Sequence, residues 1–156
     1  VSDQWKSGPQ FIIMADKTEI ATIEFGMNGQ YAVISRVSNR ITFHTNHYLS
    51  DELSRLNPEK INTSSLKRYA KINELLDSKH VLDMEESISI SQNPVLWRVG
   101  STPTSVRTLS AWTVRHYKNG HSTLHLIMAN PGMQETSYEI TLADAFSGKY
   151  EVTAVR

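Results

Sequence analysis

A cluster of polar side chains follows the alternating hydrophobic run at residues 40–43. The stretch RITFHTNHYLSDE, residues 40–52, contains two histidines and an asparagine directly after that run. A buried or half-buried Asn46 at a strand end would offer two amide N–H groups to a carbonyl oxygen that gains negative charge during acyl transfer. The same asparagine could instead be a turn residue that hydrogen-bonds its own backbone. The local sequence leaves both roles open.

Arg68 presents a similar choice. It belongs to the segment TSSLKRYAKINELL, residues 63–76, whose apolar residues recur at three- and four-residue spacings. That spacing predicts an amphipathic helix over residues 64–78, with Thr63, Ser64 or Ser65 capping its start. If Arg68 faces a sheet, its fixed positive charge could order carboxylates or a thiolate, and on the opposite face it would simply be solvated.

Two histidine pairs, His44 with His47 and His121 with His125, raise the question of a metal site. On a helix, a four-residue spacing would place both rings on one face for zinc. Here both pairs fall on predicted strands or their ends, where residues four apart are separated by roughly 13 Å at about 3.3 Å per residue. We therefore expect no metal and no cofactor. A hydrolase with His44 and His47 as zinc ligands is the alternative.

Composition excludes several classes of function. The 156 residues contain 16 Lys plus Arg and 16 Asp plus Glu, so no basic excess favours nucleic acid. The chain has no cysteine, which excludes a disulfide, a cysteine-ligated zinc or a cysteine nucleophile within these residues. No apolar run approaches the roughly 20 residues that cross a membrane, and residues 1–5 do not resemble a signal peptide. We expect one domain over residues 1–156, and the sequence names no compartment.

The elements that must position these side chains alternate between sheet and helix. An antiparallel meander is predicted first, then the helix at 64–78, a weaker helix at 81–87 and a long connection at 91–108. The predicted strands of the meander are residues 11–15, 18–25, 31–34 and 40–43. Turns are expected at 16–17, 26–29 and 38–39.

The last third of the chain returns to sheet. Asn119-Gly120 between strands at 109–117 and 121–129 is a strong hairpin signal, and a two-residue loop would pair Val114 with His125 and Trp112 with Ile127. Asn130-Pro131 should end the second strand. Further strands are expected at 138–142 and 150–155. Apolar residues occur on both faces of the hairpin, which indicates a sheet covered from two sides.

Two motifs together resemble a known family. FHTNHYLSDEL (43–53) and TSSLKRYAKINELL (63–76) resemble a pair of segments in the cysteine-type Ntn hydrolases. The resemblance is closest to the acyltransferase and amide hydrolase family that includes isopenicillin N acyltransferase. The choloylglycine hydrolases, meaning bile salt hydrolase and penicillin V acylase, carry looser versions. The segment FIIMADKTEIATIEF and the later hairpin also resemble parts of this family, so the likeness spans most of the chain.

The resemblance implies an α+β fold with four αββα layers, and hydrolysis or transfer of a small-molecule linear amide. In such enzymes autoproteolysis exposes an amino-terminal cysteine that attacks the amide carbon. Asn46 would donate to the tetrahedral oxyanion, and Arg68 would set the electrostatics around the nucleophile. The supporting residues would be Thr45, His47, Ser64 and Ser65.

The departure from the family is the missing nucleophile. We expect this chain to be the carboxy-terminal portion of a catalytic domain, inactive alone, whose partner is a missing nucleophile-bearing segment of the same protein. The alternative is a binding or structural module of the same fold. An incomplete sheet pair would leave apolar surface uncovered around Leu124, Leu126 and Met128, and such a surface favours pairing with the absent segment or with a second copy.

Overall fold

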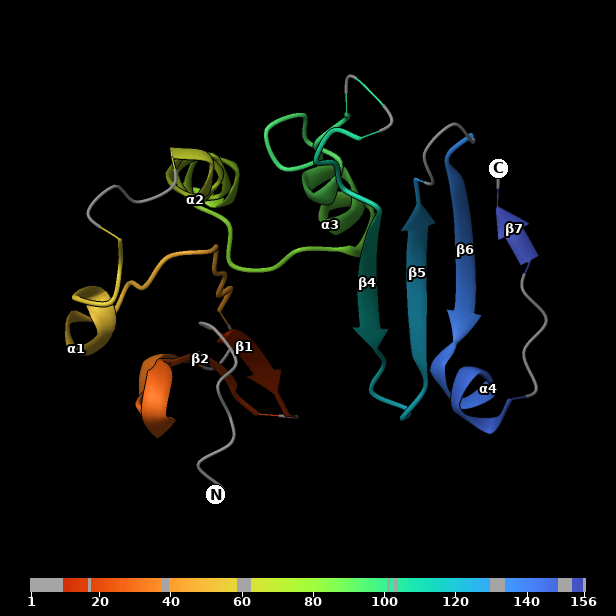
Figure 1. Ribbon diagram of the computed structural model, residues 1–156. Coiled ribbons are helices and arrows are strands. Elements are labelled where there is room, and N and C mark those ends of the chain that lie inside the picture. Colours follow the sequence, from red (N-terminus) through yellow and green to blue (C-terminus); the bar gives the residue numbers. More distant parts are fainter. Residues whose placement is uncertain are drawn as a thin grey trace. The chain divides into compact units, whose positions relative to one another are not determined.

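The computed structural model describes residues 10–16, 18–37, 40–58, 63–100, 102, 104–129, 134–148 and 153–155. The chain divides into two compact units, Val1–Leu82 and Asp83–Arg156, and each contains one antiparallel sheet (Figure 1). Helices and sheets together make the protein α+β. The single domain expected over residues 1–156 stays a prediction. The expected features at residues 1–5, 17, 38–39 and 130–131 lie outside the described residues.

The first unit contains a three-stranded meander, as predicted. Strands β1 (Gln10–Ala15), β2 (Ile20–Phe25) and β3 (Tyr31–Val37) pair in that order, and all are antiparallel. The Asp16 carboxylate accepts the backbone N–H groups of Thr18 and Glu19, which fixes the turn between β1 and β2. A short 3-10 turn, η1 (Met27–Gly29), joins β2 to β3.

The prediction of a fourth strand at residues 40–43 is wrong. This segment belongs to no strand, and side chains rather than backbone groups attach it to the sheet. The Thr42 hydroxyl lies 2.6 Å from the Thr22 hydroxyl and 2.9 Å from that of Ser35. Because hydroxyl contacts replace the ladder hydrogen bonds, the residues that follow are free to bend. Asn46 therefore lies in a bend and not at the end of a strand.

Two helices follow that bend. Helix α1 (Asp51–Ser54) is capped by Ser50, whose hydroxyl accepts the N–H of Leu53. Helix α2 (Thr63–Leu76) confirms the helix expected at 64–78. Ser64 and Ser65 lie inside α2, and the residue that precedes the helix lies outside the described residues. The fully buried Ser65 bonds to a distant segment instead of capping its own helix.

A small aromatic and aliphatic core attaches the bend to the meander. Ala32, Tyr48 and Leu53 are buried together, with Phe11 and Leu56 packed against them. The Tyr48 hydroxyl donates to the carbonyl of Phe25 at 3.0 Å, and its ring meets Phe11 edge to face. Burial of these side chains holds residues 48–56 against β1 to β3.

The described residues of the second unit form a four-stranded antiparallel sheet and two helices. Its strand order is β4-β5-β6-β7. The strands are Ser110–His116, Ser122–Met128, Thr136–Thr141 and Thr153–Val155. Helix α3 (Met84–Ser91) begins with a capping box of Asp83 and Glu86, three residues later than the predicted start, and α4 (Leu142–Ser147) was not predicted. Across the described residues, no helix combines the length and apolar character that a bilayer span requires.

The predicted hairpin is confirmed, but its register is shifted by one residue. Trp112 pairs with Leu126 and Val114 with Leu124, because the loop contains three residues rather than two. Gly120 donates to the Tyr117 carbonyl and has a positive φ of 87°, whereas Asn119 does not have a positive φ. A three-residue loop of this kind is a type I turn followed by a bulge, and it needs a positive φ at one residue only, here Gly120. A two-residue type I′ turn would need a positive φ at both of its central residues.

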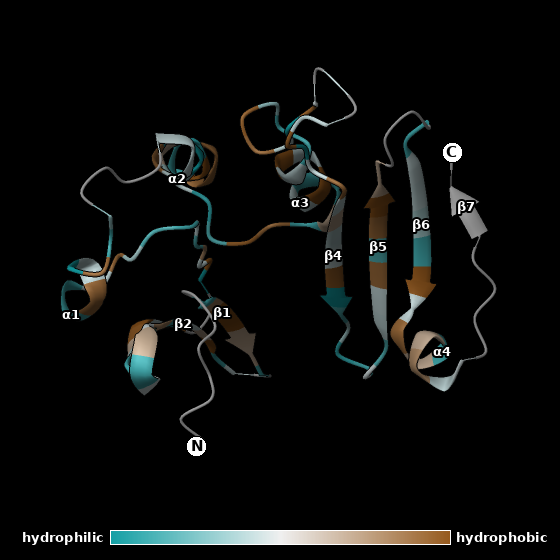
Figure 2. Ribbon diagram, in the orientation of Figure 1, coloured by the Kyte–Doolittle hydropathy of each residue, from teal (hydrophilic) through white to brown (hydrophobic). Residues whose placement is uncertain are grey.

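The register leaves part of the second sheet's apolar surface open. Trp112 is 69% exposed, while its partner Leu126 and the nearby Leu124 are half-buried. Met128 is also half-buried, and the other face of β5 buries Ile127 to 1% exposure. In Figure 2 the carboxy-terminal part of β5 carries the hydrophobic colour. The uncovered apolar surface is thus centred on Trp112 rather than on the three β5 residues.

Replacing Gly120 with alanine should destabilise the second unit by about 1 kcal/mol or more, because the left-handed conformation that glycine adopts freely is strained for alanine. Urea unfolding of the two proteins measures this difference. Lys118→Ala is the matched control, since this loop residue lacks a positive φ. Equal losses for the two variants would contradict the assigned loop geometry.

Candidate active site

Asn46 and Arg68 are in direct contact. The Arg68 Nη2 atom donates to Asn46 Oδ1 at 2.7 Å, and its Nε donates to the Ser64 carbonyl in the preceding turn of α2. Because a guanidinium can only donate, the amide oxygen of Asn46 must face it. The amide N–H groups are then directed elsewhere, and the described residues offer Nδ2 no acceptor. The side-chain amide of Asn46 is therefore fixed, and its N–H groups are available as donors.

The exposure of this pair differs from the expectation. Asn46 is exposed, although we expected it to be buried or half-buried, and Arg68 is half-buried. The cause is the bend at residues 46–47, which replaces the predicted strand end and directs Asn46 away from the core. The amide can therefore reach a group that approaches from outside the described residues.

Ser65 is the hub that holds the backbone of the bend. Its hydroxyl is fully buried and accepts the N–H of Asn46 at 2.8 Å. The same oxygen lies 2.9 Å from His47 Nδ1 and donates to Thr45 Oγ1 at 3.2 Å. Thr45 and His47 are themselves buried. Thr45, Asn46, His47, Ser65 and Arg68 therefore form one hydrogen-bonded cluster.

His47 is a neutral member of this cluster. Burial lowers the pKa of His47, the charges of His44 and Arg68 lower it further, and Glu24 partly opposes them. Its ring packs edge to face on Tyr69 of α2, with the ring centroids 5.5 Å apart. The Ser65 hydroxyl gives its one proton to Thr45 Oγ1, so a neutral His47 ring that carries its proton on Nδ1 donates to Ser65. His47 thus supports the bend from within.

Sequence reasoning missed the carboxylate beneath the bend. Glu24 of β2 is 0% exposed and contacts His44 Nε2 at 2.8 Å. It also accepts the N–H groups of Leu49 and Ser50 and the Ser50 hydroxyl. Burial raises the pKa of Glu24, but the hydrogen bonds from Ser50, Leu49 and His44 outweigh that effect and lower it below 4.5. The only sequence signal was an acidic residue on one face of an alternating strand.

The two histidines of the bend have different partners. His44 lies between Glu24 and the carbonyl of Thr45, and its ring stacks on Phe11. His47 faces Ser65 instead. Within the part of the chain that the structure describes, no group of three or more His, Cys, Asp or Glu side chains could hold a metal ion. These contacts leave both rings engaged in hydrogen bonds to the protein.

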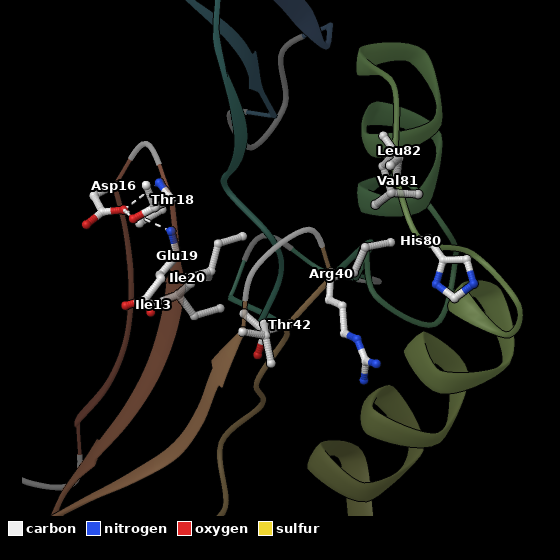
Figure 3. A pocket seen from close by; sticks show the side chains of 13 residues that line it. Ile13, Asp16, Thr18, Glu19, Ile20, Arg40, Thr42, His80, Val81 and Leu82 are labelled. Carbon is white, nitrogen blue, oxygen red and sulfur yellow. Dashed lines mark hydrogen bonds between the residues drawn. The ribbon is translucent and has the colours of Figure 1, made fainter.

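A pocket of about 450 Å³ occurs elsewhere in the first unit. Its walls are mostly apolar, and its lining includes Arg40 and His80 but neither Asn46 nor Arg68 (Figure 3). Asp16, also in the lining, is already engaged by the turn that follows β1. The predicted site residues therefore do not belong to this pocket.

Comparison with known protein families shows which family the chain belongs to. The chain is an α+β protein that matches an Ntn-hydrolase-like family model over residues 4–144, which is most of its length. The chain belongs to the acyl-coenzyme A:6-aminopenicillanic acid acyl-transferase family. A search of curated proteins finds no match to this chain. Membership in the family indicates acyltransferase or hydrolase activity.

Replacing Ser65 with alanine should lower the free energy of unfolding by about 1–3 kcal/mol, because it leaves the Asn46 N–H without its buried acceptor. Urea unfolding measures the loss. Ser89→Ala, at an exposed helix position, is the matched control and should change stability by less than about 0.5 kcal/mol. A similar result for both variants would show that Ser65 is not a hub.

Stability should fall as the pH is lowered through the titration of His47. In the unfolded chain the pKa of His47 returns to 6.5, whereas folding lowers it, so the unfolded state binds the extra proton. The stabilising effect is therefore complete above about pH 7 and is lost as the pH falls through the lower folded value. Urea unfolding at a series of pH values should give a shallower slope for His47→Gln. The exposed His80→Gln is the control, and an unchanged slope in His47→Gln would contradict the assignment.

Proposed function

We propose that this chain supplies the oxyanion-stabilising part of an amide C–N hydrolase or acyltransferase. The observation that carries this proposal is the hydrogen bond from Arg68 to the Asn46 amide oxygen. It orients the amide so that its N–H groups remain available for a developing negative charge. The bond also supports the choice of Asn46 as donor, since an asparagine that only closes a turn does not require a guanidinium.

The nucleophile would come from outside these residues, because the chain contains no cysteine. A segment of the same protein would contribute an amino-terminal cysteine, exposed by autoproteolysis, as the family resemblance implies. Its thiolate would attack the amide carbon, and the carbonyl electron pair would move to oxygen. Asn46 Nδ2 would donate to that oxyanion. Collapse would break the C–N bond, and the α-ammonium of the cysteine would protonate the departing amine to leave a thioester.

Water or an acceptor amine would then attack the thioester, which distinguishes a hydrolase from an acyltransferase. The α-amine would take the proton of the attacking group, and the cysteine sulfur would leave. Arg68 would act through charge by favouring the thiolate over the thiol. Ser65, Thr45 and His47 would hold the bend, and Ser64 would anchor Arg68 through its carbonyl. A small-molecule linear amide is the proposed substrate class.

The proposed fold is the four-layer αββα sandwich of the Ntn hydrolases. Each unit supports this proposal separately, because each sheet has an apolar surface that other protein could cover. In the first unit Met14, Tyr31 and Val33 are exposed, and in the second Trp112 is exposed. Surfaces of this kind mark interaction sites. The missing segment or a second copy of the chain would be the partner.

Replacing Asn46 with alanine in the complete protein should lower kcat by about 10²–10³-fold with little change in KM, because one oxyanion donor contributes about 3 kcal/mol to the transition state. Steady-state release of amine from a linear amide measures this loss. Asn73→Ala is the matched control, since Asn73 is an exposed asparagine on α2.

The complete protein should also form an acyl-enzyme whose mass increase lies on a cysteine outside residues 1–156. An unchanged kcat in Asn46→Ala would remove Asn46 from the mechanism. A complete protein that binds the amide without acylation would favour the non-catalytic binding module instead.

A further inference from the structure

We propose that Glu24 is a positioning residue for Asn46, and that it acts by holding both ends of the arc formed by residues 44–50. This inference rests on the proposed role of Asn46 as the oxyanion donor. Glu24 lies on β2, some twenty residues before the arc in sequence, and its side chain is completely buried. It does not touch Asn46 itself, so its effect passes through the backbone.

The two carboxylate oxygens bind opposite ends of the arc. At the first end, His44 Nε2 lies 2.8 Å from Oε1. At the other end, the N–H of Leu49 donates to the same oxygen, while the N–H and hydroxyl of Ser50 donate to Oε2. A single side chain therefore closes the arc, and Asn46 lies between the two attachment points.

The donor set requires Glu24 to be ionised. Four donors converge on the carboxylate, which offers about four lone-pair sites and no proton of its own. His44 has a matching requirement, because Nε2 faces this carboxylate and Nδ1 faces the Thr45 carbonyl, and both partners only accept. Both ring nitrogens of His44 therefore face hydrogen-bond acceptors. A buried carboxylate is costly unless it is fully hydrogen-bonded, and here its acceptor sites are filled.

The carboxylate controls the peptide plane that carries Asn46. The carbonyl oxygen of that peptide, which belongs to Thr45, is held by His44 Nδ1. Its N–H, which belongs to Asn46, is held by the Ser65 hydroxyl. Since a peptide unit is planar, two anchors on opposite sides fix its orientation and hence the direction of the Asn46 N–Cα bond, from which the side chain extends. Glu24 fixes His44, and His44 fixes one of the two anchors.

The decisive experiment compares Glu24→Gln with Glu19→Gln in the ¹⁵N-labelled complete protein. The first substitution would place an amide NH₂ where only donors converge, so at least one end of the arc must be released. Glu19 is the matched control, because it lies next to the same strand but forms an exposed ion pair with Arg36. The side-chain amide resonances of Asn46 are assigned by their disappearance in Asn46→Ala. Glu24→Gln should shift or broaden them, and Glu19→Gln should not.

The activity readout separates positioning from general stability. Glu24→Gln should lower kcat about 10²-fold, as expected for a misplaced catalytic group, while KM stays within about threefold. His44→Phe is the second variant, because it keeps a ring against Phe11 but removes both hydrogen bonds of the imidazole. His44→Phe should shift the same Asn46 resonances. If Glu24→Gln does not fold, the result for His44→Phe alone tests the positioning of Asn46.

The outcomes distinguish this inference from the proposed function. Asn46 resonances that stay in place in both Glu24→Gln and His44→Phe would overturn the positioning role. If Asn46→Ala leaves kcat unchanged, the proposed function fails, and the resonances still decide whether Glu24 holds Asn46. A loss of stability in Glu24→Gln with unchanged Asn46 resonances and unchanged kcat would make Glu24 a structural residue only, which also overturns the inference.

Discussion

A buried carboxylate must find hydrogen-bond donors, and this requirement shapes the first unit of the protein. Glu24 is inaccessible to solvent, and an ionised carboxylate in that environment is stable only when its lone pairs are filled. The donors come from His44 and from the backbone and hydroxyl around Ser50. Satisfying one charge thus imposes a fixed path on the chain between these residues. Side-chain hydrogen bonds therefore hold the polar bend at residues 44–50 where a strand ladder is absent.

Helix α2 completes the arrangement from the other side of the bend. Ser65 and Arg68 lie about one turn apart on the helix, and both reach the same asparagine. Ser65 holds its backbone N–H, and Arg68 holds its side-chain oxygen. The asparagine is therefore fixed at two points by one rigid element, while its amide N–H groups stay available. Such preorganisation is what electrostatic catalysis of acyl transfer demands.

Much of this could be predicted from local sequence, and the failures have physical causes. The meander, helix α2 and the Asn119-Gly120 hairpin follow from periodicity and turn chemistry, and the two motifs identified the family correctly. The prediction of a strand at residues 40–43 was wrong because Thr42 forms hydrogen bonds to hydroxyl groups on the sheet. The local alternation of apolar and polar residues does not reveal these long-range contacts. Glu24 was missed because the polar face of β2 turns inward, against the usual hydrophobic pattern. At both Thr42 and Glu24, polar contacts with residues distant in sequence determine the local structure.

In the proposed mechanism, the amide nitrogen of Asn46 meets the oxygen that becomes negatively charged. A crystal structure of the complete protein, with an aldehyde analogue of its amide substrate bound to the nucleophile, tests this directly. We expect the tetrahedral oxygen to lie about 2.7–3.1 Å from Asn46 Nδ2, with Arg68 still bonded to Oδ1. An oxygen bound by other donors, with Asn46 turned away from it, would show that Asn46 is not the oxyanion donor.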